Sequence, residues 1–357
     1  MLGPRPEPPS PTIAVSTSPS TPRQADLFAR QLLLFTGKGG VGKSTVVAAL
    51  GVAAAERGLR PLIVELGHRA SMGSIFPGSS IDHRPRPVAC GGRLAAMNLE
   101  LDEALFDYIA GQIKIRRIAR AIAGNASLRG LFRAAPAVRE IITLAKLQAL
   151  ADDLLDDGRR RWQPILVDLD ATGHALMLLE LPQLLRSLVE SGPLVRVTES
   201  LSGLIADRER TMLSLVSLAR EVPVQETIEL YSDLQQRHAI EVGSLFINQV
   251  PPPALPSTLL PWLSAAEAKI LGGPHQEGTL AADLRLTRRL EEEHLSARAQ
   301  IERLRVEVPE IPRVELPAIE GGLHGEKELL RLGELALATD ADAERAPTAF
   351  DRAGDDR

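Results

Sequence analysis

The sequence has little of what would mark several common classes of protein. It contains one cysteine, Cys90, among 357 residues, which excludes a disulfide framework and any Cys-X-X-Cys or multi-thiol metal site within one chain. The formal net charge is −5, so no basic excess points to binding of nucleic acid through its phosphates. No uncharged apolar run approaches the roughly 18 residues that a membrane-spanning helix needs. With no secretory leader and few thiols, the chain is expected to be soluble and cytoplasmic.

The two ends differ in composition from the middle of the chain. Residues 1–25 are rich in Pro, Ser and Thr, and residues 339–357 are polar and acidic. Both compositions are typical of disordered tails, because they supply too little apolar surface to bury. The folded part is therefore expected to span residues 26–338.

Short apolar runs alternate with helical segments between these tails. This alternation predicts an α/β fold with a mostly parallel, doubly wound sheet. Two mainly helical insertions, about 101–157 and 255–306, are longer than a crossover requires, and we expect them to pack together as a helical subdomain above the sheet. A further helix is predicted at 174–190. The predicted strands are 32–35, 61–66, 164–170, 212–218, 243–250 and 311–317.

A glycine-rich stretch, GKGGVGKST, follows the first predicted strand and precedes a predicted helix. It fits the P-loop pattern G-x-x-x-x-G-K-[ST] in the structural context that this motif requires. In a P-loop the backbone N–H groups surround the phosphates, the lysine (Lys43) contacts the β- and γ-phosphates, and the Ser44 hydroxyl binds magnesium. The sequence therefore predicts ATP and Mg²⁺ as ligands. The residues assigned to nucleotide binding in this loop are Gly37, Gly39, Gly40, Val41, Gly42, Lys43, Ser44 and Thr45.

The strand predicted at 164–170 ends in acidic residues. Asp168 closes the apolar run ILVD, which is the position of a carboxylate that holds magnesium through water beside a P-loop. Asp170 points to the same side of the strand and is a candidate for positioning the attacking water. Gly173, in the turn that follows, has an N–H that could sense a γ-phosphate.

These motifs resemble those of a known family. GKGGVGKST, DLDATGHALMLLELP, PVQETIEL and FINQV occur in the order and spacing of the arsenical-pump-driving ATPase (ArsA) family, which also includes the eukaryotic ATPase that delivers tail-anchored membrane proteins. APAVREIITLAKLQAL resembles a segment of the bacterial members. The resemblance covers roughly residues 30–338, and it implies an ATPase that works as a dimer.

In this family, a lysine after the first loop glycine marks a deviant Walker A motif, and Lys38 occupies that position. The resemblance implies that Lys38 reaches across a nucleotide-sandwich dimer to the phosphates bound by the other subunit, as an arginine finger does elsewhere. The loop surrounds phosphate with its backbone, so a side chain at its second position can point away from its own nucleotide. The alternative is an exposed, solvated lysine.

Other positions carry over by motif. Asn248 matches the asparagine that recognises adenine in the family, and Pro317 lies where the family closes over the base. Thr172, Gly173 and His174 match the switch loop that follows the magnesium-binding aspartate.

Two departures from the family pattern bear on hydrolysis rather than on nucleotide binding. The first switch of the family usually reads Asp-Pro-Ala-His, whereas this chain has Glu65-Leu66-Gly67-His68. Glu65 either orients the attacking water with a longer side chain or merely ends the strand. Ala219-Arg220 stands in place of a family Pro-Glu.

The single Cys90 also limits what the chain can couple to ATP. It cannot form the three-thiol arsenite site of the pump ATPase in one chain, the zinc clamp of the eukaryotic targeting factor, or an iron–sulfur cluster that needs two cysteines per subunit. The resemblance implies a homodimer, or a heterodimer with a homologous ATPase, that couples nucleotide-driven closure to a partner or a membrane-protein client. The alternatives are a weakly hydrolysing, nucleotide-binding regulatory subunit and a positioning ATPase of the septum-site or partition type.

Overall fold

The computed structural model describes residues 24–66, 71–112, 136–169, 176, 178–180, 193–237, 240–271, 279–319, 323 and 325–338. Nearly all of both predicted tails, most of the predicted helix at 174–190 and much of the first helical insertion lie outside these ranges. The first described element, the 3₁₀ helix η1 (Gln24–Ala29), begins two residues inside the predicted N-terminal tail.

An eight-stranded sheet forms the centre of the molecule, in the order β3-β4-β2-β5-β1-β6-β7-β8. All neighbouring strands run parallel except β3 and β4, which are antiparallel. The predicted α/β fold with a mostly parallel sheet is therefore confirmed. The strands are β1 (Leu32–Thr36), β2 (Leu62–Leu66), β3 (Arg86–Ala89), β4 (Leu94–Leu99), β5 (Ile165–Asp168), β6 (Thr211–Leu218), β7 (Val242–Val250) and β8 (Arg313–Pro317).

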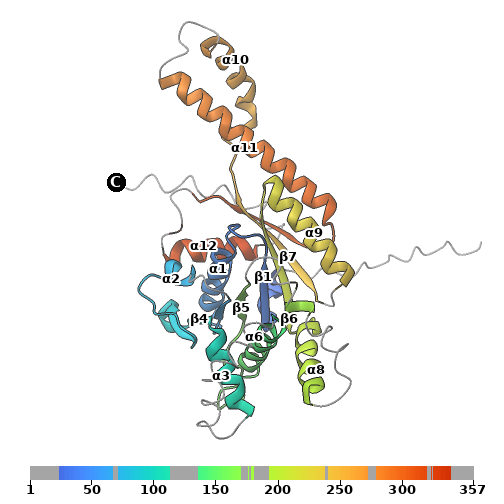
Figure 1. Cartoon of the computed structure of the whole chain (residues 1–357). Helices are drawn as coiled ribbons and strands as arrows, with labels where there is room; N and C mark the ends of the chain where they lie inside the picture. Colours follow the sequence, from blue (N-terminus) through green and yellow to red (C-terminus); the bar gives the residue numbers. More distant parts are fainter. Residues whose placement is uncertain are drawn as a thin grey trace, which may run out of the picture.

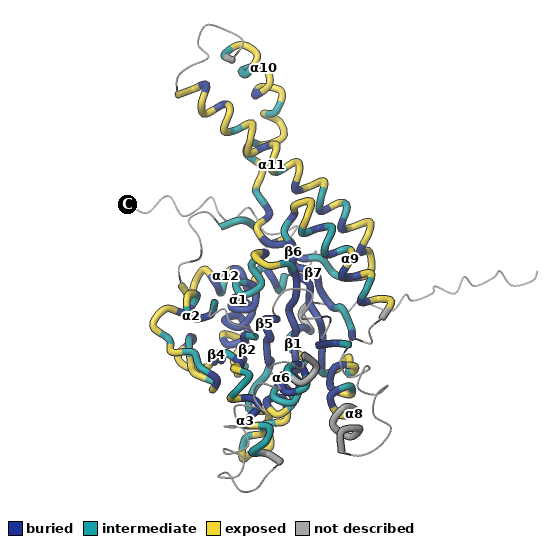
Figure 2. The backbone as a smooth tube through the Cα atoms, in the orientation of Figure 1, coloured by how far each residue is buried: buried dark blue, intermediate teal, exposed yellow. Residues whose placement is uncertain are grey.

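Helices cover both faces of this sheet, as a doubly wound fold requires. Side chains along β1 alternate between the two faces: Leu32 and Leu34 join one apolar cluster, and Leu33 and Phe35 join the other. The first cluster includes side chains of α3, α6, α8, α9 and α11, and the second includes those of α1, α2 and α12. Figure 2 shows the central strands as the most deeply buried part of the chain. The helices are α1 (Lys43–Glu56), α2 (Ser71–Ile75), α3 (Leu101–Gln112), α6 (Pro136–Ala151), α8 (Pro193–Ala206), α9 (Glu221–Arg237), α10 (Leu260–Leu271), α11 (Thr279–Glu307) and α12 (Glu326–Leu337), with 3₁₀ turns η2 (Cys90–Gly92) and η3 (Ser257–Leu259).

The sequence analysis missed five of these strands and α-helices: β3, β4, α2, α8 and α12. The strand β3 has only four residues, two of them exposed, and contains an arginine and a proline. The strand β4 includes two alanines and an asparagine, so neither has a clear strand pattern. The helix α12 packs closely on α1, and a Cβ at Gly333 would lie 2.3 Å from the carbonyl oxygen of Ala49. The close approach of these two helices requires glycine at this position.

The two helical insertions do not pack together in the described residues, contrary to expectation. The helices α3 and α6 contact each other, whereas α11 contacts α9, α10 and β7. Figure 1 shows α10 and the first half of α11 projecting from the molecule at the end opposite α3. The reason is topological: α3 follows β4 near one edge strand of the sheet, whereas α10 and α11 connect β7 to β8, the two strands at the opposite edge.

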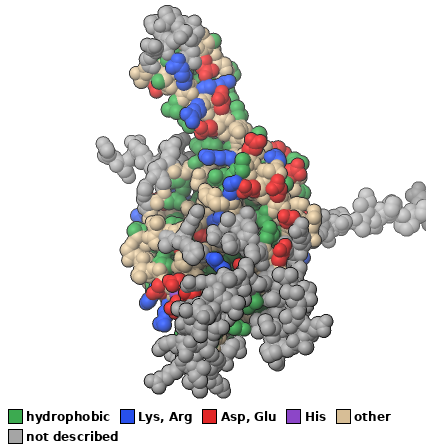
Figure 3. Space-filling view, viewed as in Figure 1, with side chains coloured by type: hydrophobic (Ala, Val, Ile, Leu, Met, Phe, Trp, Pro, Cys, Tyr) green, Lys and Arg blue, Asp and Glu red, His purple; other side chains and the backbone are tan. Residues whose placement is uncertain are grey.

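We call residues 260–271 and 279–295 the arm. The helix α11 has 29 residues and is therefore about 43 Å long, so its second half covers the sheet while its first half extends beyond it (Figure 1). The arm carries exposed apolar side chains, including Trp262 and Leu286, among charged ones (Figure 3). None of the helices that the structure describes is both long enough and apolar enough to cross a bilayer.

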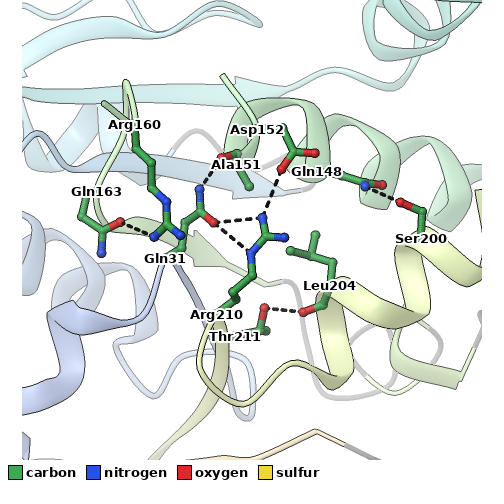
Figure 4. Close-up of polar contacts among 10 residues, drawn as sticks. All are labelled: Gln31, Gln148, Ala151, Asp152, Arg160, Gln163, Ser200, Leu204, Arg210 and Thr211. Atoms are coloured by element: carbon green, nitrogen blue, oxygen red, sulfur yellow. Dashed lines mark hydrogen bonds and ion pairs between the residues drawn. The ribbon is translucent and has the colours of Figure 1, made fainter. Parts of the chain in front are cut away.

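A polar network fixes the amino-terminal end of the sheet (Figure 4). Gln31, just before β1, donates a hydrogen bond to the carbonyl oxygen of Ala151 at the end of α6. Arg210, just before β6, donates to the Gln31 side chain at 3.0 and 3.2 Å and to Asp152 at 3.1 Å. These contacts tie α6 to two central strands at the edge of the sheet that lies away from the P-loop.

Candidate functional site

The P-loop connects β1 to α1 as predicted, and two of its glycines have no room for a side chain. Gly37 has φ +150°, and a Cβ there would lie 2.1 Å from the carbonyl oxygen of Val216 in β6. Gly42 has φ +89°, and a Cβ there would lie 2.2 Å from Asn248 Nδ2 in β7. The loop therefore keeps its shape because the backbone of β6 and the side chain of Asn248 approach it closely.

The loop ends at the amino terminus of α1, with Gly42 as the N-cap and no side-chain cap. The first N–H groups of a helix have no partner within the helix, and together with the helix dipole they favour an anion. Gly39 and Gly40 are exposed, whereas Val41 is buried and anchors the loop in the core. Ser44 and Thr45 follow in the first turn and are half-buried. This arrangement can hold phosphate oxygens.

The Lys43 side chain folds back over this loop. Its Nζ donates hydrogen bonds to the carbonyl oxygens of Gly37 at 3.0 Å and Lys38 at 3.1 Å. The ammonium group is thereby held at the mouth of the loop, where a bound phosphate chain would meet a positive charge.

Ser44 and Asp168 come together at the same edge of the sheet. The Ser44 hydroxyl donates to Asp168 Oδ2 at 2.5 Å, because β1 and β5 are neighbours with Phe35 opposite Asp168. Magnesium is commonly held by one or two protein oxygens together with substrate phosphates, and this pair of oxygens fits that pattern. Within the described part of the chain, no cluster of three or more His, Cys, Asp or Glu side chains offers an all-protein metal cage.

Glu65 lies one strand away from Asp168, directly opposite it in the pairing of β2 and β5. Its side chain is buried, and each oxygen accepts a hydrogen bond: Oε1 from the backbone N–H of Ser71 at 2.6 Å, and Oε2 from Asn98 Nδ2 at 3.3 Å. Burial raises the pKa of Glu65, the Ser71 N–H opposes that rise, and the Asp168 charge adds to it. The contacts to Ser71 and Asn98 were not anticipated, since neither residue belongs to a recognisable motif.

Lys38 is paired with a carboxylate of its own chain. Its ammonium forms an ion pair with Glu226 of α9, and both side chains are 37% exposed. Glu226 belongs to the segment PVQETIEL, which the sequence analysis used for the resemblance without assigning Glu226 a role. The contact between Lys38 and Glu226 is visible only in the folded structure, because 188 residues separate the two partners in the sequence.

Asn248 and Pro317 both lie at the carboxyl ends of neighbouring strands. Asn248 is buried, and its Nδ2 donates to the carbonyl oxygen of Val41 in the P-loop at 2.9 Å. Pro317 pairs with Val250 two residues beyond Asn248. The structure thus brings the two predicted base-contacting residues to the edge of the sheet that carries the P-loop. Asp170, Gly173 and the rest of the predicted switch loop, like Gly67 and His68, lie outside the described residues.

Comparisons with known proteins find similar sequences among ATPases. Residues 30–204 match the family model described as anion-transporting ATPase. The chain is 26% identical to the protein named ATPase BagA of Mycobacterium tuberculosis over 307 residues, which cover 82% of this chain and 88% of that protein. It is 30% identical to an arsenical pump-driving ATPase of Acidiphilium multivorum over 246 residues (62% of this chain, 40% of the relative), and 29% identical to one of Escherichia coli over 223 residues (57% and 36%). The P-loop, the sheet and these matches together show that the chain belongs to the ArsA family of P-loop ATPases.

Proposed function

We propose that this chain binds ATP with Mg²⁺ and hydrolyses it as a dimer, and that nucleotide-driven closure of the dimer is coupled to a partner or a membrane-protein client. Family membership makes the chain an ATPase. The observation that carries the proposal is the 2.5 Å contact between Ser44 and Asp168, because it joins the P-loop to the carboxylate that a metal-dependent phosphoryl transfer needs.

The phosphate chain would lie against the N–H groups of the P-loop and the first turn of α1. Lys43 would exchange its bonds to the loop carbonyls for bonds to the β- and γ-phosphates. Ser44 and Asp168 would hold Mg²⁺, which neutralises charge on the phosphates when bound.

Asn248 and Pro317 would contact the adenine. A carboxamide nitrogen has two N–H groups, so Asn248 Nδ2 can keep one on Val41 and donate the other to N7. Its oxygen can accept from the N6 amino group. In this arrangement, Asn248 links the base to the loop that holds the phosphates.

The contacts of Glu65 favour the interpretation in which this residue ends its strand and holds the next segment. Both of its oxygens already serve Ser71 and Asn98. Asp170 would then be the residue that positions the attacking water, with Gly173 beside the γ-phosphate. The same observation favours a second candidate function, a weakly hydrolysing nucleotide-binding subunit that pairs with a homologous ATPase. Magnesium-dependent turnover by the purified chain alone would exclude this second function.

Coupling to a partner would run from β7 into the arm. His294 Nδ1 donates to the carbonyl oxygen of Pro251 at 2.8 Å, and Glu291 accepts from the N–H of Ala254 at 3.0 Å. The segment that follows Asn248 is therefore attached to α11. Movement at the nucleotide edge would be transmitted to the arm and its exposed apolar side chains.

The test compares wild type with Lys38→Ala. The wild type should dimerise with a non-hydrolysable ATP analogue and Mg²⁺ in light-scattering chromatography, and should hydrolyse ATP. Lys38→Ala should lose the dimer and lower turnover by about 10³-fold, the lower end of the range for a charge supplied in trans. Lys327→Ala, which removes an exposed lysine of α12, is the matched control. Retention of both dimerisation and turnover by Lys38→Ala would refute the dimer proposal.

A further inference from the structure

The ion pair between Lys38 and Glu226 joins the P-loop to α9 within one chain. We propose that Glu226 is a positioning residue that holds Lys38 in its own protomer until a triphosphate bound by a second protomer replaces the carboxylate. This inference rests on the proposed dimer. It assigns a role to Glu226, and it identifies a competitor that the closing dimer must displace.

The position of Glu226 is fixed by its neighbours on α9. Thr227 is buried, and its hydroxyl donates to the carbonyl oxygen of Pro223 at 2.7 Å and lies within hydrogen-bond distance of Ser217 Oγ of β6, at 2.9 Å. Gln225 accepts a hydrogen bond from Arg303 of α11. The helix turn that carries Glu226 is thus attached both to the sheet and to a second helix. Lys38 has a flexible four-carbon side chain, so its ammonium group can leave the carboxylate while the loop backbone keeps its shape.

The ion pair between Lys38 and Glu226 is weak enough for another anion to replace the carboxylate. An exposed ion pair typically changes an equilibrium by a factor of only about 1.4 to 5. Both side chains are 37% exposed. A triphosphate carries more negative charge than one carboxylate, so it can replace Glu226 as the partner of Lys38. A closed dimer releases two such pairs, and the factor for the dimer is therefore squared, to about 2 to 25.

The test is Glu226→Gln, which removes the charge and keeps the size of the side chain. With a non-hydrolysable ATP analogue and Mg²⁺, the dimer dissociation constant measured by sedimentation should fall about 2- to 25-fold. The protein concentration at half-maximal ATP turnover should fall by the same factor, which a purely structural role would not produce. Glu221→Gln removes an exposed carboxylate of the same helix and should change neither quantity.

Two further variants keep the proposal falsifiable. Glu226→Asp retains the charge on a shorter side chain and should lie between wild type and Glu226→Gln. In a Lys38→Ala background, Glu226→Gln should have no effect on dimerisation, because its action runs through the lysine.

The outcomes separate this inference from the proposed function. If Lys38→Ala dimerises like wild type, the dimer proposal fails, and the inference falls with it. If Lys38→Ala abolishes dimerisation but Glu226→Gln behaves like Glu221→Gln, or weakens the dimer, the dimer proposal stands and the role assigned to Glu226 is wrong.

Discussion

The Ser44 hydroxyl lies 2.5 Å from Asp168 Oδ2, although 124 residues separate them in the sequence. Ser44 lies in the first turn of the helix that follows β1, and Asp168 ends β5, the strand next to β1 in the sheet. Because parallel strands end at the same edge, the pairing of β1 with β5 is what brings the two oxygens together.

The first prediction concerns this contact. Asp168→Asn keeps the shape of the side chain but removes the charge that would hold Mg²⁺, so magnesium-dependent ATP hydrolysis should fall about 10- to 100-fold. A phosphate-release assay over a range of Mg²⁺ concentrations measures the effect. Asp157→Asn, at an exposed turn with its own partner Arg159, is the control. Equal turnover in the two variants would contradict a metal role for Asp168.

The second prediction concerns pH and Glu65. Burial raises the pKa of Glu65 above its usual 4.5, so the folded state binds this proton more tightly than the unfolded chain. Protonated Glu65 contributes fully to the free energy of unfolding below the pKa that it has in the unfolded chain. This contribution is lost as the pH rises through the higher pKa of the folded protein, at ~1.4 kcal/mol for each unit by which folding raises the pKa. Glu65→Gln should therefore gain unfolding free energy relative to wild type as the pH increases from about 4.5. Urea unfolding of both proteins between about pH 4.5 and 8 tests this. If the difference in free energy of unfolding between the two proteins stays constant or shrinks as the pH rises, burial does not disfavour the charged form of Glu65.

The third prediction concerns the packing of α12 on α1. Gly333→Ala places a methyl group 2.3 Å from the Ala49 carbonyl oxygen, and such overpacking should cost about 1–3 kcal/mol of unfolding free energy. Gly203→Ala is the matched control: it lies inside α8, where a Cβ would meet nothing within 4 Å, and it should stabilise the protein by about 0.5–1 kcal/mol. Denaturant unfolding of the two variants should therefore shift in opposite directions. A shift of the same sign in both would contradict the close approach of the helices.

The fourth prediction concerns the single thiol. Burial, together with the charges of Glu326 and Glu56, raises the pKa of Cys90 to about 11. Because the thiolate is the reactive form, Cys90 should react with a disulfide reagent at pH 8 at least about 10-fold more slowly in the folded protein than in denaturant. Absorbance of the released thiol measures both rates, and comparable rates would show that the thiol is accessible. We also expect Cys90→Ser to leave ATP turnover unchanged.

The features that depended on local sequence were predicted well. The P-loop, the strands β1, β2, β5, β6, β7 and β8, and the position of Asp168 at a strand end follow from short apolar runs and from glycines at fixed spacing. These signals are local because an apolar run or a fixed glycine spacing can be recognised from residues a few positions apart. The sequence also excluded thiol-based sites, since one cysteine cannot supply several ligands.

Long-range packing decided the rest. Asn98 meets Glu65, and Glu226 meets Lys38, only because strand order and helix packing bring distant segments together. The separation of the two helical insertions likewise depends on strand order, because one follows β4 near one edge of the sheet and the other connects β7 to β8 at the opposite edge. The sequence by itself determined which groups could bind a nucleotide; the tertiary structure decided which carboxylates face those groups, because burial and pairing are set by neighbours that lie tens to hundreds of residues away.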